Sequence, residues 1–162
     1  SLAEIENFDS LIIDRYSIKY IKEELKKKDL NKVFVTQAGY DEEIDYNIDF
    51  LVVSKDEIDV VEANRLLNED FVNWILLTSS NLPARLLSKD GVIEIAPPDF
   101  KTINSTGAGD ITAAYIGAFG IEDVIETTKN ACAAGALLAG TSTFPSLTKI
   151  KEISELVEIN PR

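Results

Sequence analysis

The sequence predicts an α/β fold in which a mostly parallel β-sheet lies between two layers of helices, a three-layer αβα sandwich. Short runs rich in β-branched residues alternate with stretches of helical period, which is the pattern of βαβ units. The 162 residues are also 45% hydrophobic, and no repeat, low-complexity tract or linker divides them. We therefore expect residues 1–162 to form a single α/β domain of ordinary core size.

The first half of the chain supplies the predicted parallel strands. An amphipathic helix at Tyr16–Lys28, with its apolar residues on one stripe, separates the first two strands. A second helix, at Glu57–Leu67, separates the last two. Both helices are expected to pack on the sheet. The four strands are predicted at Leu11–Ile13, Val33–Thr36, Phe50–Val53 and Trp74–Thr78.

An antiparallel hairpin and then helices are predicted for the second half. The strands Arg85–Leu87 and Val92–Ile95 are joined through Lys89-Asp90-Gly91, and Asp-Gly supplies the positive φ that a tight turn requires. Pro97-Pro98 is expected to end the sheet. The remainder is expected to be helical, at about Ala108–Phe119, Ile121–Ala139 and Leu147–Val157.

The charge of the chain argues against several classes of partner. A formal net charge of -12 comes from 28 Asp and Glu against 16 Lys and Arg. Such a sequence offers no basic face to neutralise phosphates, so we expect neither a nucleic-acid partner nor binding to an anionic membrane. No charged and apolar leader begins the sequence, and the longest small-apolar stretch, Ala131–Gly140, is too short to span a bilayer. The single cysteine, Cys132, cannot form an intrachain disulfide, and we expect a cytoplasmic protein.

One motif carries chemistry. The stretch Asn104-Ser105-Thr106-Gly107-Ala108-Gly109-Asp110 runs directly into the helix-forming segment Ile111–Phe119. The glycines let successive N–H groups point at one spot, and the helix that starts there adds its positive dipole end, so the motif predicts an anion cradle. Asp110 would lie within reach of a hydroxyl that attacks a bound phosphate. Because the chain has no histidine, a general base has to be a carboxylate, lysine or tyrosine, which favours Asp110.

The motif has a plainer interpretation as well. Ser/Thr-Gly-x-Gly-Asp before an apolar run is also an ordinary capped helix start with an acidic first turn. Two named motifs are excluded: a P-loop would end in Gly-Lys-Ser/Thr, and a dinucleotide fingerprint would have a third glycine where Thr112 stands.

Several segments together resemble one protein family. Thr106–Asp110, opening a small-residue helix in the last third of an α/β chain, resembles the C-terminal signature of the ribokinase-like (PfkB) carbohydrate kinases. Phe50–Glu57 resembles the strand and turn with the family's Asn-x-x-Glu motif, and Trp74–Thr78 the strand ending in Thr-x-Gly. Lys89–Ile95 resembles the hairpin before the signature, and Asn130–Ala136 the Ala-rich helix after it. Four further segments in the family's order are much more specific than one, and they favour the kinase fold over a plain capped helix.

The resemblance implies an activity. The protein is expected to be an ATP-dependent phosphotransferase that moves the γ-phosphate to a hydroxyl of a sugar or nucleoside acceptor. Gly107, Ala108 and Gly109 would supply the anion hole for the transferred phosphoryl group, and Asp110 would take the proton from the acceptor hydroxyl. Mg²⁺ would accompany the nucleotide, and Glu57 would help to hold it through water.

The resemblance also implies nucleotide contacts. Thr78 and Thr106 would lie at the phosphates, and Asn130 would contact the adenine region. Each of these residues has a structural alternative: Glu57 as a first-turn helix acid, Thr78 as a strand end, and Asn130 as a helix-surface residue.

Four departures from the family pattern affect the nucleotide site. Asn104 stands where the family usually has Asp at the head of the signature, which removes a charge near the monovalent-cation loop. Ser54 replaces the Asn of Asn-x-x-Glu, and Ser80 replaces the glycine of Thr-x-Gly. Thr141–Pro145 lacks the glycine expected after the Ala-rich helix. These differences predict an atypical nucleotide site.

The resemblance covers nearly the whole chain but only the C-terminal half or so of a usual family member, so we expect a partial or shortened version of the fold. The sugar-binding half is not visible in the sequence. Three hypotheses follow: a PfkB-type kinase or its nucleotide half, a noncatalytic nucleotide-binding or regulatory relative, and a structural or interaction domain. Under the third, exposed sheet edges would favour self-association, such as a homodimer.

Overall fold

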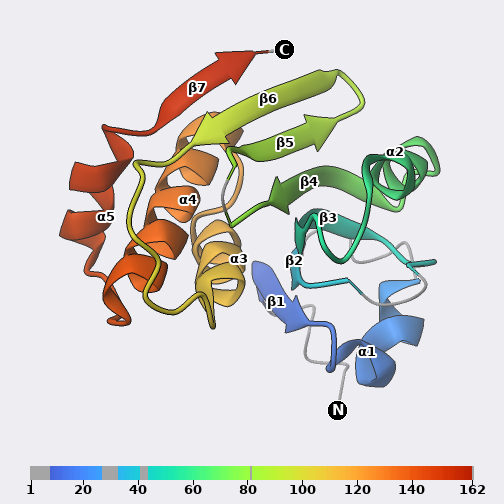
Figure 1. Ribbon diagram of the computed structural model, residues 1–162. Coiled ribbons are helices and arrows are strands. Elements are labelled where there is room, and N and C mark those ends of the chain that lie inside the picture. Colours follow the sequence, from blue (N-terminus) through green and yellow to red (C-terminus); the bar gives the residue numbers. More distant parts are fainter. Residues whose placement is uncertain (1–7, 27–32, 41–43, 81, 162) are drawn as a thin grey trace.

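The computed structural model describes residues 8–26, 33–40, 44–80 and 82–161. Seven strands form one sheet whose spatial order follows the chain, β1-β2-β3-β4-β5-β6-β7 (Figure 1). The first four strands are parallel to one another, and each later strand is antiparallel to its neighbour. The predicted α/β class and mostly parallel core are confirmed.

The four predicted parallel strands are all present, each longer than the sequence suggested or shifted by one or two residues. Along β3, Phe50 and Val52 face one side of the sheet while Leu51 and Val53 face the other, and all four are buried. Burial on both faces explains why this strand reads as a continuous apolar run. The strands are β1 (Ser10–Asp14), β2 (Phe34–Ala38), β3 (Ile48–Ser54) and β4 (Val72–Thr78).

The antiparallel part of the sheet holds one strand more than predicted. The hairpin of β5 (Ala84–Ser88) and β6 (Gly91–Ala96) is confirmed, and Gly91 has φ +150°. The expectation that everything after Pro97-Pro98 is helical is wrong, because β7 (Glu158–Pro161) pairs with β6. Four residues at the end of a chain are too few to show strand periodicity, and the proline is tolerated because β7 is an edge strand.

Helices cover both faces of the sheet, which confirms the three-layer arrangement (Figure 1). One face packs against the first two helices, and the other face packs against the last three. No helix in the described part of the chain is long and apolar enough to cross a bilayer. The helices are α1 (Ile18–Leu25), α2 (Val60–Asn68), α3 (Ala108–Phe119), α4 (Val124–Thr141) and α5 (Leu147–Ser154).

Three helices begin two or three residues later than predicted, and an aspartate explains each case. Asp14 accepts the N–H groups of Tyr16 and Ser17 in a turn, so α1 starts at Ile18. Asp59 and Asp123 act as N-caps of α2 and α4 by accepting from the backbone N–H three residues on, at 2.8 and 3.0 Å. The predicted end of α1 at Lys28 lies outside the described residues, and α5 ends at Ser154, before Val157.

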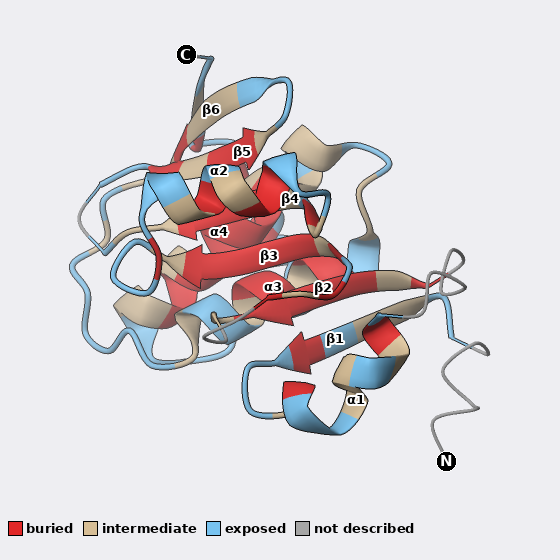
Figure 2. Cartoon of the chain, turned by 90° about the vertical axis from the view of Figure 1, so that its right-hand side faces the viewer, coloured by how far each residue is buried: buried red, intermediate tan, exposed pale blue. Residues whose placement is uncertain are grey.

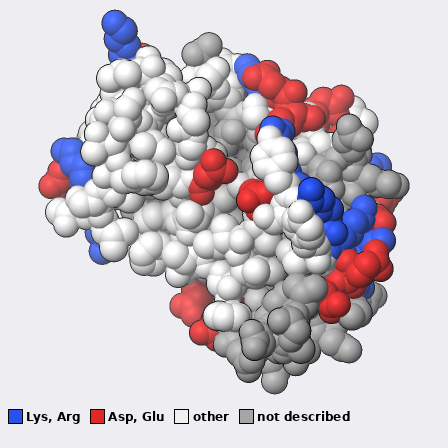
Figure 3. All heavy atoms as spheres, turned by 90° about the horizontal axis from the view of Figure 1, so that it is seen from below, with Lys and Arg blue, Asp and Glu red and all other residues white. Residues whose placement is uncertain are grey.

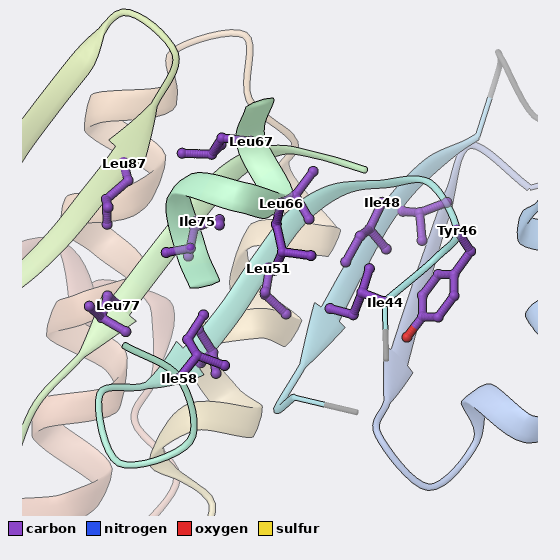
Figure 4. Packing of buried hydrophobic residues seen from close by; sticks show 14 of the residues in the cluster. Ile44, Tyr46, Ile48, Leu51, Ile58, Leu66, Leu67, Ile75, Leu77 and Leu87 are labelled. Atoms are coloured by element: carbon purple, nitrogen blue, oxygen red, sulfur yellow. The ribbon is translucent and has the colours of Figure 1, made fainter. Parts of the chain in front are cut away.

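Two hydrophobic clusters hold the layers together. In the first, Leu66 and Leu67 of α2 pack on Leu51 of β3 and Ile75 of β4 (Figure 4). Figure 2 shows β3 as almost wholly buried, whereas the surfaces of β1 and α1 are partly exposed. The second cluster joins the opposite face of the sheet to α3, α4 and α5 through small residues such as Ala113 and Ala134, both 0% exposed. Small side chains bring these helices close to the sheet and to each other.

Candidate functional site

A large cavity lies where the parallel strands of the described chain end. Its volume is about 1130 Å³. The ends of β1, β2, β3 and β4 line it, together with the first turn of α3, the segment 96–102 and one side of α4. This is the edge at which open α/β sheets bind their ligands, as the sequence predicted. Of the sequence-predicted site residues, the cavity brings together Glu57, Thr78, Gly107, Ala108, Gly109 and Asp110.

The first turn of α3 opens into this cavity without a side-chain cap. Gly107 is the N-cap residue, with φ +81° and ψ -2° in the left-handed region, and it has no side chain to accept a hydrogen bond. By contrast, Asp59, Asp123 and Ser146 cap the N-termini of α2, α4 and α5. The first N–H groups of a helix have no intrahelical partner. In α3 the Ala108 N–H donates to the Ser105 carbonyl oxygen at 3.1 Å, whereas the N–H groups of Gly109 and Asp110 have no partner among the described residues. These two lie at the positive end of the helix dipole.

Hydrogen bonds within the loop and to α4 hold the segment that precedes Gly107. Asn104 Oδ1 accepts a hydrogen bond from the Thr106 backbone N–H at 3.0 Å, which folds the loop toward Gly107. The backbone N–H groups of Ile103 and Asn104 both donate to the carbonyl oxygen of Ala139 in α4, at 2.8 and 3.1 Å. The asparagine that stands in place of the family's Asp therefore shapes the turn with its side chain.

Asp110 and Arg15 come from distant parts of the chain and lie at the same cavity. Asp110 is exposed in the first turn of α3, and Arg15 follows β1 directly. The pKa of Arg15 is raised, first by its hydrogen bond to the Tyr16 hydroxyl and further by the carboxylates of Glu57 and Asp110. The sequence reasoning did not single out Arg15. Its signal was available, because Asp14-Arg15-Tyr16 follows a predicted strand at the ligand-binding edge.

Glu57 precedes α2 and lies in the turn after β3, so the interpretation as a first-turn helix acid is wrong. Its Oε2 accepts from the Ser54 backbone N–H at 2.9 Å. Its Oε1 accepts from Arg15 Nη1 at 3.1 Å and from the Tyr40 backbone N–H at 3.4 Å. The carboxylate is thus held at the cavity wall by three elements of the fold. Within the described chain, no cluster of three or more His, Cys, Asp or Glu residues could hold a metal ion.

The end of β4 is tied to β3. Thr78 lines the cavity, and its hydroxyl donates to the Val53 carbonyl oxygen at 3.2 Å. Ser79 and Ser80 follow at the cavity wall. The Ser79 Oγ is buried and has no hydrogen-bond partner among the described residues.

Asn130 and Thr106 are the two predicted site residues outside the cavity lining. Asn130 is 6% exposed, and its Nδ2 donates to the carbonyl oxygen of Glu126, one turn earlier in α4, at 2.8 Å. Its Oδ1 is buried without a partner among the described residues. Thr106 is exposed beside the cradle. Its backbone N–H is taken by Asn104.

The surface does not concentrate basic side chains on the face seen in Figure 3. There, Lys and Arg lie beside Asp and Glu, and much of the remaining surface is uncharged. Ion pairs of this kind include Lys22 with Asp45 at 2.9 Å and Lys26 with Asp45 at 2.9 Å.

Comparison with known proteins identifies the fold. No family model matches the sequence, and no curated protein matches it. Among solved structures, a proposed phosphofructokinase from Staphylococcus aureus is 20% identical, with a TM-score of 0.75 over 98% of this chain and 60% of that one. A ribokinase from Thermotoga maritima is 15% identical, with a TM-score of 0.73 over 94% and 59%. A proposed ribokinase II from E. coli, in complex with ATP and Mg²⁺, is 14% identical, with a TM-score of 0.77 over 96% and 61%.

These matches extend along almost the whole chain, whereas the chain spans only about 60% of the length of the structures it matches. The expectation of a partial or shortened version of the fold is therefore confirmed. Identities of 20% or less carry information about the fold alone. The resemblance read from the sequence is confirmed at that level, and the chain has the ribokinase-like fold of the PfkB-type kinases.

Proposed function

We propose that the protein is an ATP-dependent phosphotransferase of the PfkB carbohydrate kinase type, which moves the γ-phosphate of ATP to a hydroxyl of a sugar or nucleoside. One observation carries the proposal. The N-terminus of α3 has no side-chain cap, begins at a left-handed glycine and opens into the cavity at the strand ends, with a carboxylate in its first turn. The N–H groups of Gly109 and Asp110, which have no partner among the described residues, suit an anion, and the Asp110 carboxylate suits a proton acceptor.

The proposed reaction uses the two parts of this turn. The backbone at Gly107, Ala108 and Gly109 binds the oxygens of the transferred phosphoryl group. Asp110 accepts the proton of the acceptor hydroxyl while the hydroxyl oxygen bonds to the γ-phosphorus and the bond from that phosphorus to the β-γ bridging oxygen breaks. ADP leaves with the bridging oxygen. Little covalent chemistry falls to the protein in such a transfer, so positioning and charge supply most of the rate.

The donor set fits a Mg²⁺ ion that arrives with a nucleotide. Mg²⁺ is usually bound by one or two carboxylates together with substrate phosphates and water. A carboxylate oxygen can accept two hydrogen bonds, and Oε2 of Glu57 accepts a single described one, from Ser54. Glu57 is therefore the carboxylate proposed to help hold the ion through water. When bound, Mg²⁺ offsets the triphosphate charge that the acidic cavity would otherwise repel.

The proposed nucleotide contacts differ in how well their positions support them. Thr78 lies at the cavity wall, which supports its proposed contact with the phosphates. Thr106 lies beside the cradle and would contribute through its exposed hydroxyl. Asn130 would need to reach the adenine region from a buried position, where its unpartnered Oδ1 is the atom left for a hydrogen bond.

A noncatalytic nucleotide-binding relative is the second candidate. It is favoured by the pairing of Glu57 with Arg15, since a guanidinium 3.1 Å from the carboxylate competes with a metal-bound water for the same group. Ser54, which stands in place of the family's asparagine, offers a shorter polar reach to that water.

We further propose a cytoplasmic protein with no nucleic-acid partner. The net charge of -12 opposes binding to nucleic acids. A lone cysteine cannot form an intrachain disulfide, which suits a reducing compartment, and burial raises the pKa of the Cys132 thiol to about 12. We also propose self-association, because β1 and β7 are the edge strands of the sheet.

Calorimetric titration with ATP and with ADP, each with and without Mg²⁺, tests the proposed function. Saturable binding that strengthens with Mg²⁺ supports a nucleotide site. Release of ADP in the presence of a sugar or nucleoside then distinguishes the kinase from the noncatalytic relative. Absence of any nucleotide binding would contradict both and favour an interaction domain with a plain helix start.

A further inference from the structure

The proposed reaction assigns no role to Arg15, a basic side chain that lines the cavity. Two basic residues, Arg15 and Lys101, line the cavity together with five acidic ones. An acidic cavity repels anionic ligands unless a placed cation receives them. Arg15 stands at the β1 end of the cavity, where its backbone N–H donates to the Ala38 carbonyl oxygen of β2 at 3.1 Å. The acidic lining residues are Asp14, Asp56, Glu57, Asp99 and Asp110.

The Arg15 guanidinium is held in place and still has donors to offer. Nη2 donates to the Tyr16 hydroxyl at 2.9 Å, and the carbon Cζ lies 4.9 Å from the centre of the Tyr16 ring. Nη1 donates to Glu57 Oε1 at 3.1 Å. An arginine carries five N–H donors in a planar fork, so three have no hydrogen-bond partner among the described residues. The side chain is 44% exposed, which leaves it accessible to a ligand.

The ion pair with Glu57 does not by itself explain why an arginine stands at position 15. The Glu57 carboxylate already accepts backbone N–H groups from Ser54, at 2.9 Å, and from Tyr40, at 3.4 Å. Those bonds come from the ends of two neighbouring strands and are enough to orient a carboxylate. The stacking on Tyr16 fixes the guanidinium itself.

The sheet order indicates which ligand Arg15 would meet. β1 and β4 are separated by two strands, which at about 4.8 Å per strand spacing places their ends ~14 Å apart. The proposed phosphate contact Thr78 ends β4, whereas Arg15 follows β1. Figure 1 shows α4, which also lines the cavity, on the far side of α3 from β1. α3 packs against β1, β2 and β3, and its Asp110 is close enough to Arg15 to act on its charge. The acceptor, which must reach Asp110 from the side opposite the nucleotide, therefore lies against Arg15.

We propose that Arg15 binds an anionic group of the acceptor, so that the substrate of the proposed phosphotransferase is an alcohol carrying a phosphate or carboxylate group. A guanidinium fork matches both oxyanions in a bidentate manner, which an ammonium does not. A neutral sugar would leave the three remaining donors facing water and would gain nothing from the arginine. This inference rests on the proposed function, because it assumes that Asp110 marks the acceptor hydroxyl.

Binding of matched neutral and anionic probes tests the inference without turnover. The protein is first saturated with Mg²⁺ and the non-hydrolysable analogue AMP-PNP, and then titrated calorimetrically with fructose, fructose 6-phosphate, ribose, ribose 5-phosphate and gluconate. We expect at least one anionic probe to bind tenfold or more tightly than the neutral sugars. Preference for the phosphate esters assigns a phosphorylated acceptor, and preference for gluconate assigns a carboxylate.

Three variants separate recognition from structural support. R15Q is expected to remove the tenfold preference, and R15K to retain only part of it, because lysine keeps the charge but loses the fork. R85Q is the matched control, since Arg85 pairs with Glu94 at a similar exposure of 40% on β5 and is not among the residues that line the cavity. It should leave the preference unchanged. Binding of AMP-PNP is measured with and without Mg²⁺ in each variant.

The two proposals fail in different ways. If AMP-PNP does not bind, the phosphotransferase proposal falls, and the inference falls with it. If AMP-PNP binds but neutral and anionic probes bind equally or not at all, the inference alone is overturned. The same conclusion follows if R15Q changes the Mg²⁺ dependence of AMP-PNP binding and leaves the acceptor preference intact, because Arg15 then acts only through Glu57.

Discussion

A β-carbon built on Gly135 would lie 2.6 Å from Thr112 Oγ1, so the packing of α3 on α4 depends on the absence of a side chain at position 135. The same β-carbon would lie 3.1 Å from the carbonyl oxygen of Ala108, in the first turn of α3. The Thr112 hydroxyl donates to that oxygen at 2.7 Å and lies 3.3 Å from the Ala131 oxygen in α4. The position of the anion cradle is therefore set by close contact with α4.

Gly135→Ala is expected to lower the free energy of unfolding by about 1–3 kcal/mol, the usual effect of forcing an extra carbon into a packed site. A glycine-to-alanine change inside a helix would otherwise stabilise by about 0.5–1 kcal/mol. Urea denaturation measures the loss, and calorimetry with AMP-PNP should show weaker binding because the first turn of α3 shifts. Adding Thr112→Ala should restore part of the stability. A Gly135→Ala protein as stable as the wild type would contradict this account.

Gly109→Val is expected to weaken AMP-PNP binding at least tenfold while the protein stays folded. A β-carbon at Gly109 meets nothing within 4 Å, so the side chain has room in the unliganded protein but stands where a phosphate must approach. Gly107→Ala is the contrasting variant. Its φ of +81° costs an alanine about 1–2 kcal/mol, so its main effect should appear in urea denaturation. An unchanged dissociation constant in folded Gly109→Val would rule out the cradle as the phosphate site.

The sequence predicted the helix and the parallel strands that carry the site better than it predicted the residues around them. The bounds of α3 were predicted to the residue, because the glycine-rich turn before it and Gly120 after it punctuate a continuous apolar run. The parallel strands were found for a related reason, since their burial on both faces leaves apolar runs that are easy to see. Both signals are local in sequence.

Features that depend on contacts between distant segments were missed. β7 forms a strand because it pairs with the free edge of β6, and the residues Glu158–Pro161 alone do not predict that pairing. Arg15 lines the candidate site because the sheet order places the end of β1 beside the first turn of α3. Asn130 was assigned on the resemblance alone, which carries no information on the direction of its side chain, and this side chain points back along α4.

Tyr40 is expected to make stability fall as the pH rises from 10 to 12. Burial, followed by its hydrogen bond to Glu62 at 2.6 Å, raises the pKa of Tyr40 to about 12 from an ordinary 10. Because the folded state keeps this proton longer than the unfolded state, the contribution is complete below pH 10 and is lost between the two pKa values. Tyr40→Phe should flatten that part of the profile of unfolding free energy against pH. Tyr20→Phe, at a side chain 72% exposed, is the control, and equal profiles for both variants would contradict the assignment.

Asp110→Asn is expected to lower kcat by about 10²–10⁴-fold, the usual contribution of a general base, while nucleotide binding stays within about threefold of the wild type. The reason is geometric: the substitution keeps the shape of the first turn and the backbone N–H groups of the cradle, which bind phosphate, and removes only the group that takes the proton. Asp99→Asn is the matched control, because Asp99 lines the same cavity from the segment after β6 and has no part in the proposed proton transfer. Steady-state kinetics on the acceptor found by probe binding, together with calorimetry on ADP, gives both quantities. Turnover retained in Asp110→Asn, or an equal loss in Asp99→Asn, would mean that the proton leaves by another route and that the carboxylate of α3 serves only the charge balance of the cavity.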